Sequence, residues 1–216
     1  MANLTADRKS IRKDGTLFSQ PVAATTVVYA GALVCLNSSG YAVTAADDAT
    51  QTFAGKADSR GDNSSGANGA VSVEGHREGV FEFTTSAMTQ ADVNENAYIV
   101  DDNTVGKGIV AQPSNVTGVA LKRIPTSRGG TRALQYTNTG TTLSWGGGSA
   151  VTVSSNGDYT LTATDGSQIL ATVTQASLPG SDQSDNIQLR HIKCGKVAEV
   201  ASATSVYVDI LGAVRG

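Results

Sequence analysis

The chain contains little of several residue types that define common protein classes. Its 216 residues include two cysteines, four prolines, two histidines and one tryptophan. A secreted all-β protein of this size would often carry more disulfide bridges than two cysteines can form. No apolar run approaches the roughly 20 residues of a membrane-spanning helix, and the polar first 15 residues lack the apolar centre of a signal peptide. We therefore expect a protein that is synthesised in the cytoplasm and has no membrane partner.

Charged residues are also scarce, at 16% of the chain against roughly 25% in an average globular protein. The net charge is −3, which does not suit a protein that binds nucleic acid by overall electrostatic attraction. We therefore expect no nucleic-acid partner. Small uncharged residues fill the deficit, among them 24 glycines. The length is sufficient for a buried core in one large domain or two small ones.

Short runs of alternating apolar and polar residues are the main structural signal. Side chains two residues apart lie on one face of a strand, so each run predicts a strand with one buried face, as at 71–73, 80–83 and 206–210. Turn sequences separate the runs, among them Asn37-Ser38-Ser39-Gly40. Helical signal is confined to one turn near residues 89–94, which Thr89 is expected to cap ahead of Asp92. The pattern predicts an all-β fold, a small barrel or sandwich.

The distribution of charge divides the chain. Residues 133–189 contain four aspartates and no lysine or arginine, whereas basic residues gather at both borders of this stretch. Gly129-Gly130 lies at the first border. Such a shift in composition is typical of an inserted domain, which we place at 126–191. The alternative is a single sandwich with one uncharged face.

The inserted stretch has its own strand pattern. Six strands are expected, at 131–136, 142–145, 150–153, 159–163, 169–173 and 186–191. Asn156-Gly157 and Asp165-Gly166 are strong signals for hairpin turns. This spacing predicts a small immunoglobulin-like sandwich. Trp145 is expected to anchor its core, and the alternative is an open indole that stacks on a sugar.

The sequence offers no recognisable catalytic constellation. The two histidines, His76 and His191, have no neighbours at the spacing of a zinc site, and His76 is expected at the tip of a hairpin between 71–73 and 80–83. Asp101-Asp102-Asn103 lacks the rest of a calcium loop, and Gly146-Gly147-Gly148 lacks the rest of a phosphate loop. We therefore expect no enzyme activity, no catalytic or metal-binding residues and no cofactor.

The basic N-terminus is the most suggestive functional segment. Four cations and one apolar residue stand between Asp7 and Asp14: Arg8, Lys9, Ile11, Arg12 and Lys13. Such a run is ordinarily a solvated terminus. It also suits an arm that docks on an acidic surface of a neighbouring protein, with Ile11 as an apolar anchor.

Several segments near both ends of the chain carry a family resemblance by their order and spacing. They read AGALVCLNSSGYAV (30–43), FAGKA (53–57), DNSSGA (62–67), VSV (71–73), GVFEF (79–83), NAYIVDD (96–102), GKVAEV (195–200) and VYVDI (206–210). Together they resemble the capsid decoration, or head cement, proteins of tailed bacteriophages. The resemblance covers about 16–110 and 194–211, and the roughly 80 residues between are a departure from the family.

The resemblance implies a homo-oligomer, dimer or trimer, that binds the major capsid protein on the outer surface of the virion head and stabilises the expanded shell. It brings no catalytic residues. The expected division is an N-terminal arm (1–15), a capsid-binding β core (16–125 with 192–216) and the inserted domain (126–191). The alternative is a tail-tube or surface-display protein whose insert binds host glycan or receptor through Tyr136, Trp145 and Tyr159.

Overall fold

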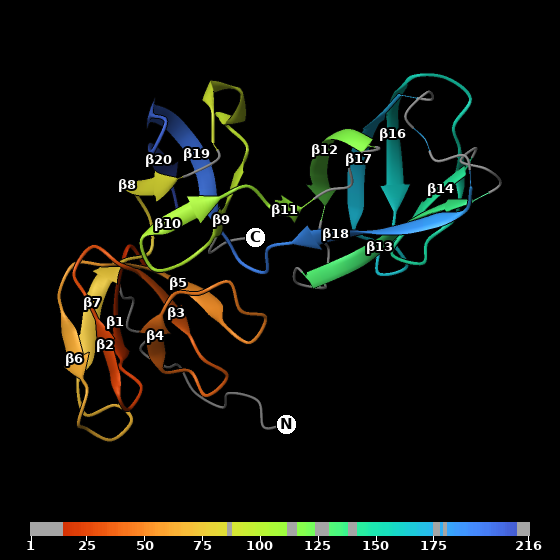
Figure 1. The fold of residues 1–216 in the computed structure, drawn as a ribbon. Helices are drawn as coiled ribbons and strands as arrows, with labels where there is room; N and C mark the ends of the chain where they lie inside the picture. Colours follow the sequence, from red (N-terminus) through yellow and green to blue (C-terminus); the bar gives the residue numbers. More distant parts are fainter. Residues whose placement is uncertain are drawn as a thin grey trace, which may run out of the picture.

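A computed structural model gives the fold (Figure 1). It describes residues 15–85, 88–111, 116–123, 130–137, 142–174, 178 and 181–210, with backbone alone for 111 and 116–123. The described residues form twenty strands and one short 3₁₀ helix. The predicted all-β class is confirmed. Three units are visible: an N-terminal unit, a closed barrel and a sandwich on the far side of the barrel.

The N-terminal unit is built on a five-stranded antiparallel sheet with a two-stranded ribbon beside it. The sheet has the order β1-β7-β5-β3-β4, and the ribbon pairs β2 with β6. Their bounds are β1 Leu17–Pro21, β2 Thr26–Val28, β3 Leu33–Leu36, β4 Ala42–Thr44, β5 Thr52–Ala57, β6 Gly61–Asn63 and β7 Ser72–His76. Apolar side chains between sheet and ribbon form one core, which includes Phe18, Val28, Val34 and Val73.

The barrel combines strands from the middle and the end of the chain. Its order is β10-β8-β20-β19-β9, and it closes through the antiparallel pairing of β10 with β9. The bounds are β8 Val80–Thr85, β9 Asn96–Ile99, β10 Thr104–Gly106, β19 Lys193–Ser202 and β20 Ser205–Asp209, with the 3₁₀ helix at Gln90–Asp92. Leu33, Cys35 and Phe53 of the N-terminal sheet belong to the barrel's apolar core. The two units therefore pack as one body.

The third unit is a two-sheet sandwich with its own core. Its sheets have the orders β11-β18-β13-β14-β15 and β12-β17-β16. The bounds are β11 Ile109–Ala111, β12 Val116–Arg123, β13 Gly130–Thr137, β14 Thr142–Trp145, β15 Val151–Thr152, β16 Gly157–Thr162, β17 Gln168–Val173 and β18 Gln183–Leu189. The β12-β17-β16 sheet matches the B-E-D sheet of an immunoglobulin domain, and β18-β13-β14 matches F-C-C′. In an immunoglobulin domain the last strand, G, pairs with F. Here the chain passes from β18 into β19 of the barrel, and β11 pairs with β18 in the place of strand G.

Most strands fall where alternation predicts them. In β20, Val206 and Val208 are buried in the barrel while Tyr207 and Asp209 are partly exposed. All six strands expected in the insert are present, and their inward side chains form one cluster around Trp145, which is fully buried. The helical turn is present too: the N–H of Thr89 donates to Asp92 at 2.7 Å.

Turn chemistry explains two tight connections. The Asn37 side-chain oxygen accepts hydrogen bonds from the N–H groups of Ser39 and Tyr41, each at 3.0 Å, and Gly40 has a φ of 82°. This turn joins β3 to β4. Asp165-Gly166 joins β16 to β17 as predicted, with Gly166 at a φ of 78°. A φ in this range strains any residue with a Cβ atom, so glycine suits both positions.

Three predicted details are wrong. Residues 109–123 contribute β11 and β12 to the sandwich, so the insert begins near 109 and not at 126, and eight of the described strands belong to it. Asn156-Gly157 is not a hairpin turn, because β15 and β16 lie in different sheets. His76 is not at a hairpin tip, because β7 pairs with β1 and β5, whereas β8 pairs with β10 and β20. Local turn signals do not reveal which sheet the next strand joins.

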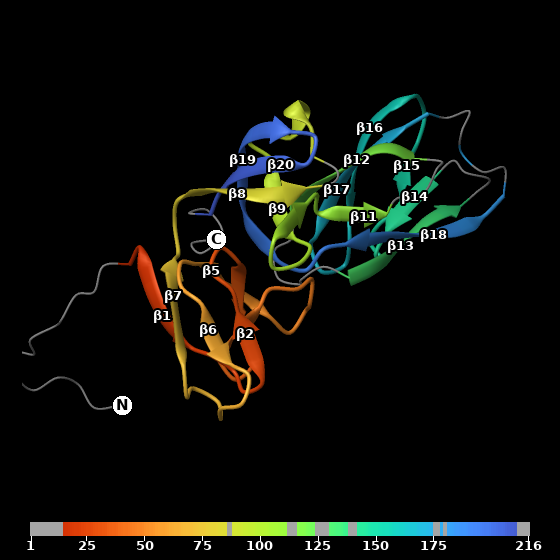
Figure 2. The ribbon, with the colours of Figure 1, turned by 60° about the vertical axis from the view of Figure 1, so that its left-hand side comes forward.

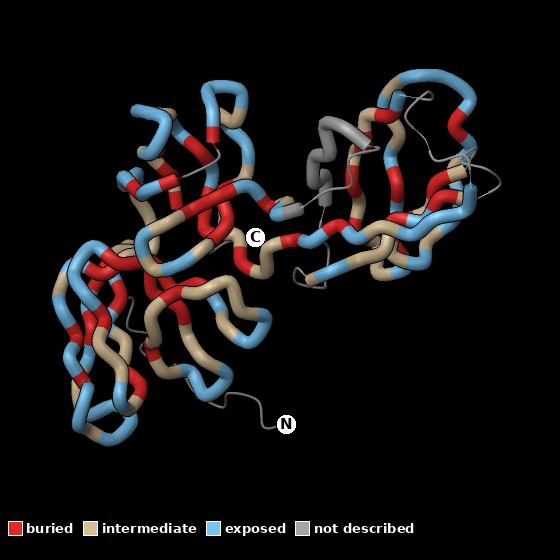
Figure 3. The backbone as a smooth tube through the Cα atoms, in the orientation of Figure 1, coloured by how far each residue is buried: buried red, intermediate tan, exposed pale blue. Residues whose placement is uncertain are grey.

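Figure 3 shows how burial follows this organisation. Buried residues are concentrated in the strands of all three units, and exposed residues gather on the connecting loops. Both cysteines are buried in the barrel core, as expected for Cys35. Burial raises the pKa of the Cys194 thiol far above its usual range, so the neutral thiol is the stable form.

Candidate functional site

The residues predicted to form the docking arm cannot be placed. Arg8, Lys9, Ile11, Arg12 and Lys13 lie outside the described residues, which begin at Gly15. Three described regions carry the other candidate features: the edge of β1, the connection to the sandwich and the sandwich itself. No group of three or more histidine, cysteine, aspartate or glutamate side chains suited to a metal ion occurs among the residues that the structure describes.

The outer edge of β1 is a candidate for strand pairing. Thr16 accepts a hydrogen bond from the N–H of Arg77 at 2.7 Å, so the alternating backbone groups of Leu17 and Ser19 point away from β7. Among the described residues, no strand pairs with this edge. Leu17 is 57% exposed. Pro21 has no N–H group to offer, which confines an added strand to a short stretch and limits unspecific aggregation.

Two short connections, residues 107–108 and 190–192, join the sandwich to the barrel, and we call them the neck. The chain leaves the barrel after β10 and returns to it between β18 and β19. Strand β11 pairs with β18 where the sandwich begins (Figure 2). The N–H of Arg190 donates to the carbonyl oxygen of Gly108 at 2.8 Å. Both ends of the insert therefore meet at one point, as expected of a domain added into a surface connection.

Asp47 clamps this neck to the N-terminal unit. It lies in the connection from β4 to β5, and its Oδ1 accepts a hydrogen bond from the N–H of His191 at 2.7 Å. The same oxygen lies 3.0 Å from Nδ1 of His191, and Oδ2 lies 3.3 Å from Nη1 of Arg190. The three side chains are only 18–24% exposed. The carboxylate thus links all three units where the sandwich is attached.

The other histidine belongs to a second carboxylate cluster. His76 Nε2 lies 2.7 Å from Oδ2 of Asp58, and Nζ of Lys56 lies 2.8 Å from Oδ1. The Lys56 ammonium and the His76 ring both lie against Phe81 of the barrel, at 5.1 and 5.9 Å between centres. The cluster therefore spans the contact between the N-terminal sheet and the barrel.

Asp101-Asp102-Asn103 forms a turn of the barrel. Oδ1 of Asp101 accepts hydrogen bonds from the N–H groups of Asn103 and Thr104 at 2.9 and 2.7 Å. This carboxylate completes a local turn between β9 and β10, which is how aspartate commonly acts at such positions.

The aromatic residues named for a sugar site do not form one. Trp145 and Tyr136 are fully buried in the sandwich core, so neither ring can stack on a ligand. Tyr159 is half-buried, and its hydroxyl donates to the carbonyl oxygen of Ser155 at 2.8 Å. Arg132 covers the Trp145 ring at 5.5 Å and pairs with Asp165 at 2.8 Å. The stacking interpretation of Trp145 is therefore wrong, and its predicted role as a core anchor is confirmed.

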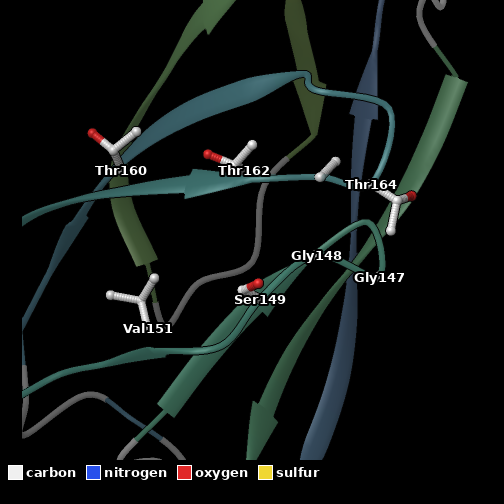
Figure 4. A pocket seen from close by; sticks show the side chains of 8 residues that line it. Gly147, Gly148, Ser149, Val151, Thr160, Thr162 and Thr164 are labelled. Carbon is white, nitrogen blue, oxygen red and sulfur yellow. The ribbon is translucent and has the colours of Figure 1, made fainter.

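A shallow hollow of about 310 Å³ lies on the sandwich beside β16 (Figure 4). Small side chains line it: Gly147, Gly148, Ser149, Val151, Thr160, Thr162, Ala163 and Thr164. A Cβ atom on Gly148 would lie 1.7 Å from the carbonyl oxygen of Thr162, so the turn needs glycine to approach β16. The glycine run is thus explained by packing.

The described surfaces offer strand edges and polar patches for binding. In the part of the chain that the structure covers, no helix has the length and apolar character needed to span a membrane. Comparison of the chain with protein-family models, with curated proteins and with solved structures gives no match.

Proposed function

We propose that this protein decorates the head of a tailed bacteriophage, binding the outer surface of the expanded shell and stabilising it. The observation that carries the proposal is that strands from two distant parts of the chain pair with each other in the barrel. The segments that resemble decoration proteins lie almost 100 residues apart, yet β19 and β20 pair directly with β9 and β8. A decoration-protein core interrupted by one inserted domain has this arrangement.

The proposed mechanism is binding without chemistry. A protein that binds only the expanded shell stabilises it by linkage, by about 4 kcal/mol per site at a thousandfold excess over Kd. Many identical sites multiply this effect. The outer edge of β1, with which no described strand pairs, supports the proposal, because main-chain hydrogen bonds to a neighbouring strand need no particular side chains. The neighbour is the major capsid protein or another copy of the chain in a dimer or trimer.

The inserted sandwich has the role of a projection in this proposal. Its two connections meet at the Asp47 clamp, so the core can contact the shell while the sandwich stands away from it. The alternative role is glycan or receptor binding by an insert on a tail. Two of the three aromatic residues named for it, Trp145 and Tyr136, are buried and cannot contact a ligand.

Binding to purified heads tests the proposal. Protein labelled at a surface lysine is mixed with expanded and with unexpanded heads of the phage that encodes it, and the particles are sedimented. We expect saturable binding to expanded heads at a fixed number of copies per head, with little binding to unexpanded ones. Equal binding to both forms, or none to either, contradicts the proposal.

A shortened chain tests the arm in the same assay. Removal of residues 1–14 deletes none of the described residues, and we expect binding of the shortened chain to heads to weaken. A chain in which Arg8, Lys9, Arg12 and Lys13 are replaced by serine is the matched control for charge. If both variants occupy heads as the full chain does, the predicted arm has no role in head binding.

A further inference from the structure

The outer wall of the barrel carries an acidic face on three neighbouring strands. Strands β8, β20 and β19 lie side by side in that order. Val206 and Val208 point into the core, so the alternate residues of β20 point outward. The same alternation places Glu82 of β8 and Glu199 of β19 outside, and both are exposed.

Two cross-strand rows make up this face. Tyr207 lies directly opposite Glu82 on one side and Glu199 on the other. Opposite residues in a sheet have Cβ atoms roughly 4.5–5.5 Å apart, so two carboxylates flank one phenol ring. In the next row Asp209 lies between Val80 and Lys196, and Val80 is 55% exposed.

This arrangement suits a basic, extended peptide with some apolar character. A guanidinium or ammonium group over Tyr207 would gain a cation–π contact and the attraction of two carboxylates. The exposed Val80 offers an apolar contact beside them. The N-terminal segment of the chain has matching chemistry, with four cations around Ile11.

The segment is attached close to one end of these strands. Thr16 is hydrogen-bonded to Arg77, and Val80 begins β8 three residues later. The N–H of Ile210 donates to Gly79 at 3.0 Å, which fixes this end of β20 beside the same point. Fourteen residues in extended form span up to about 46–50 Å, far more than the width of three strands, roughly 10 Å. Such a short tether gives a high effective concentration.

We propose that residues 8–13 dock on the chain's own barrel face, with their cations around Tyr207 between Glu82 and Glu199 and with Ile11 against Val80. The inference builds on the arm predicted for the proposed function, and it concerns the free protein. Docking holds the arm against its own barrel until a stronger partner replaces the contact. It is tested without heads, so its failure and the failure of head binding are separate results.

Limited trypsin digestion of the full-length protein tests the docking. Trypsin cleaves after Arg8, Lys9, Arg12 and Lys13, and mass spectrometry follows each cut. At low ionic strength we expect cleavage at these sites in the wild type to be about tenfold slower than in E82K/E199K. We expect about 1 M salt, which shortens the Debye length to about 3 Å, to remove most of the difference.

Two further variants separate docking from general charge and from misfolding. E82Q/E199Q removes both charges, and glutamine retains a side-chain oxygen for the hydroxyl of Ser205, which hydrogen-bonds to Glu82. We expect it to be cleaved nearly as fast as E82K/E199K. E74K/D158K reverses two exposed carboxylates on β7 and β16, outside the three strands of this face, and should leave the protection unchanged.

Several results would overturn the docking. One is equal cleavage in the wild type and in E82Q/E199Q. Another is equal loss of protection in E74K/D158K. A third is protection that rises with protein concentration, because the arm would then bind a second copy. Zero-length cross-linking gives an independent reading: links from Lys9 or Lys13 to Glu82 or Glu199 are expected within single chains, and links only between chains contradict the proposal.

Discussion

Replacement of Asp47 by alanine should loosen the neck and destabilise the core, meaning the N-terminal unit and the barrel, more than its position in a loop suggests. The change removes two contacts to His191 and one to Arg190. Nε of Arg190 is already buried without a hydrogen-bond partner among the described residues. Hydrogen bonds to charged groups contribute about 1.5–3 kcal/mol each when buried. Since about a fifth of each side chain is exposed, we expect a net loss of about 2 kcal/mol.

The position of the single tryptophan makes the assay selective. Trp145 lies in the sandwich core, so its fluorescence follows unfolding of the insert, whereas far-ultraviolet circular dichroism follows all three units. With a urea dependence of about 1–3 kcal/mol per molar, Asp47→Ala should lower the core midpoint by about 1 M. The fluorescence midpoint should move by much less, because the sandwich core contains neither Asp47 nor His191.

Asp62→Ala is the matched control for this prediction. It also removes an aspartate–arginine pair, but Arg60 and Asp62 are 55% and 42% exposed, and such surface pairs contribute little to stability. If Asp47→Ala and Asp62→Ala destabilise the core equally, the clamp is refuted. If fluorescence and circular dichroism shift together for Asp47→Ala, the sandwich and the core unfold as one unit.

Three further predictions follow from the fold. Removal of residues 109–189, with a short glycine–serine linker, should leave a soluble, folded core, because the residues on either side of the cut are already hydrogen-bonded. Gly148→Ala should cost more than 3 kcal/mol of sandwich stability because its Cβ would overlap a backbone carbonyl. At Gly147 a Cβ would make only an ordinary contact, 3.5 Å from Thr164, but φ is 72°, so Gly147→Ala should cost about 1 kcal/mol. Burial raises the pKa of Tyr98 to about 12, so the core should lose about 2 kcal/mol as the pH rises from 10 to 12, and Tyr98→Phe should remove this loss.

Each of these predictions has a clear opposing result. An insoluble product from the shortened chain would mean that the core depends on the sandwich. Equal fluorescence midpoints for the two glycine variants would contradict the close approach of Gly148 to β16. Below pH 10 the phenol of Tyr98 is neutral in both the folded and the unfolded state, so its burial costs no stability there. Above pH 10 it ionises in the unfolded state first, and the free energy of unfolding falls. Identical alkaline unfolding of the wild type and Tyr98→Phe would therefore show that this phenol is not buried.

The sequence predicts individual strands well because alternation is a local property. The runs at 71–73, 80–83 and 206–210 each gave a strand with the expected buried face. The inserted domain was visible because its composition changes, and Trp145 took the expected core position.

Pairing between distant segments is what the sequence does not reveal. Residues 109–123 show no clear alternation, although β12 pairs with β17 along much of its length. The Glu74–Gly79 stretch reads as a hairpin turn, but the chain passes there from one unit to the next. Asp47 was missed because its partners are 143 and 144 residues away, and a lone aspartate in a polar loop carries no signal.

The central claim is that this protein acts by binding the outside of a phage head. An electron cryomicroscopy reconstruction of the mature particle tests it most directly. A second reconstruction, of a particle whose copies of this protein lack residues 109–189, serves as the comparison. The account predicts repeated density for the core on the outer shell, with a separate projecting lobe that disappears in the second map. Density confined to the tail, or an outer shell with no added density, would contradict it.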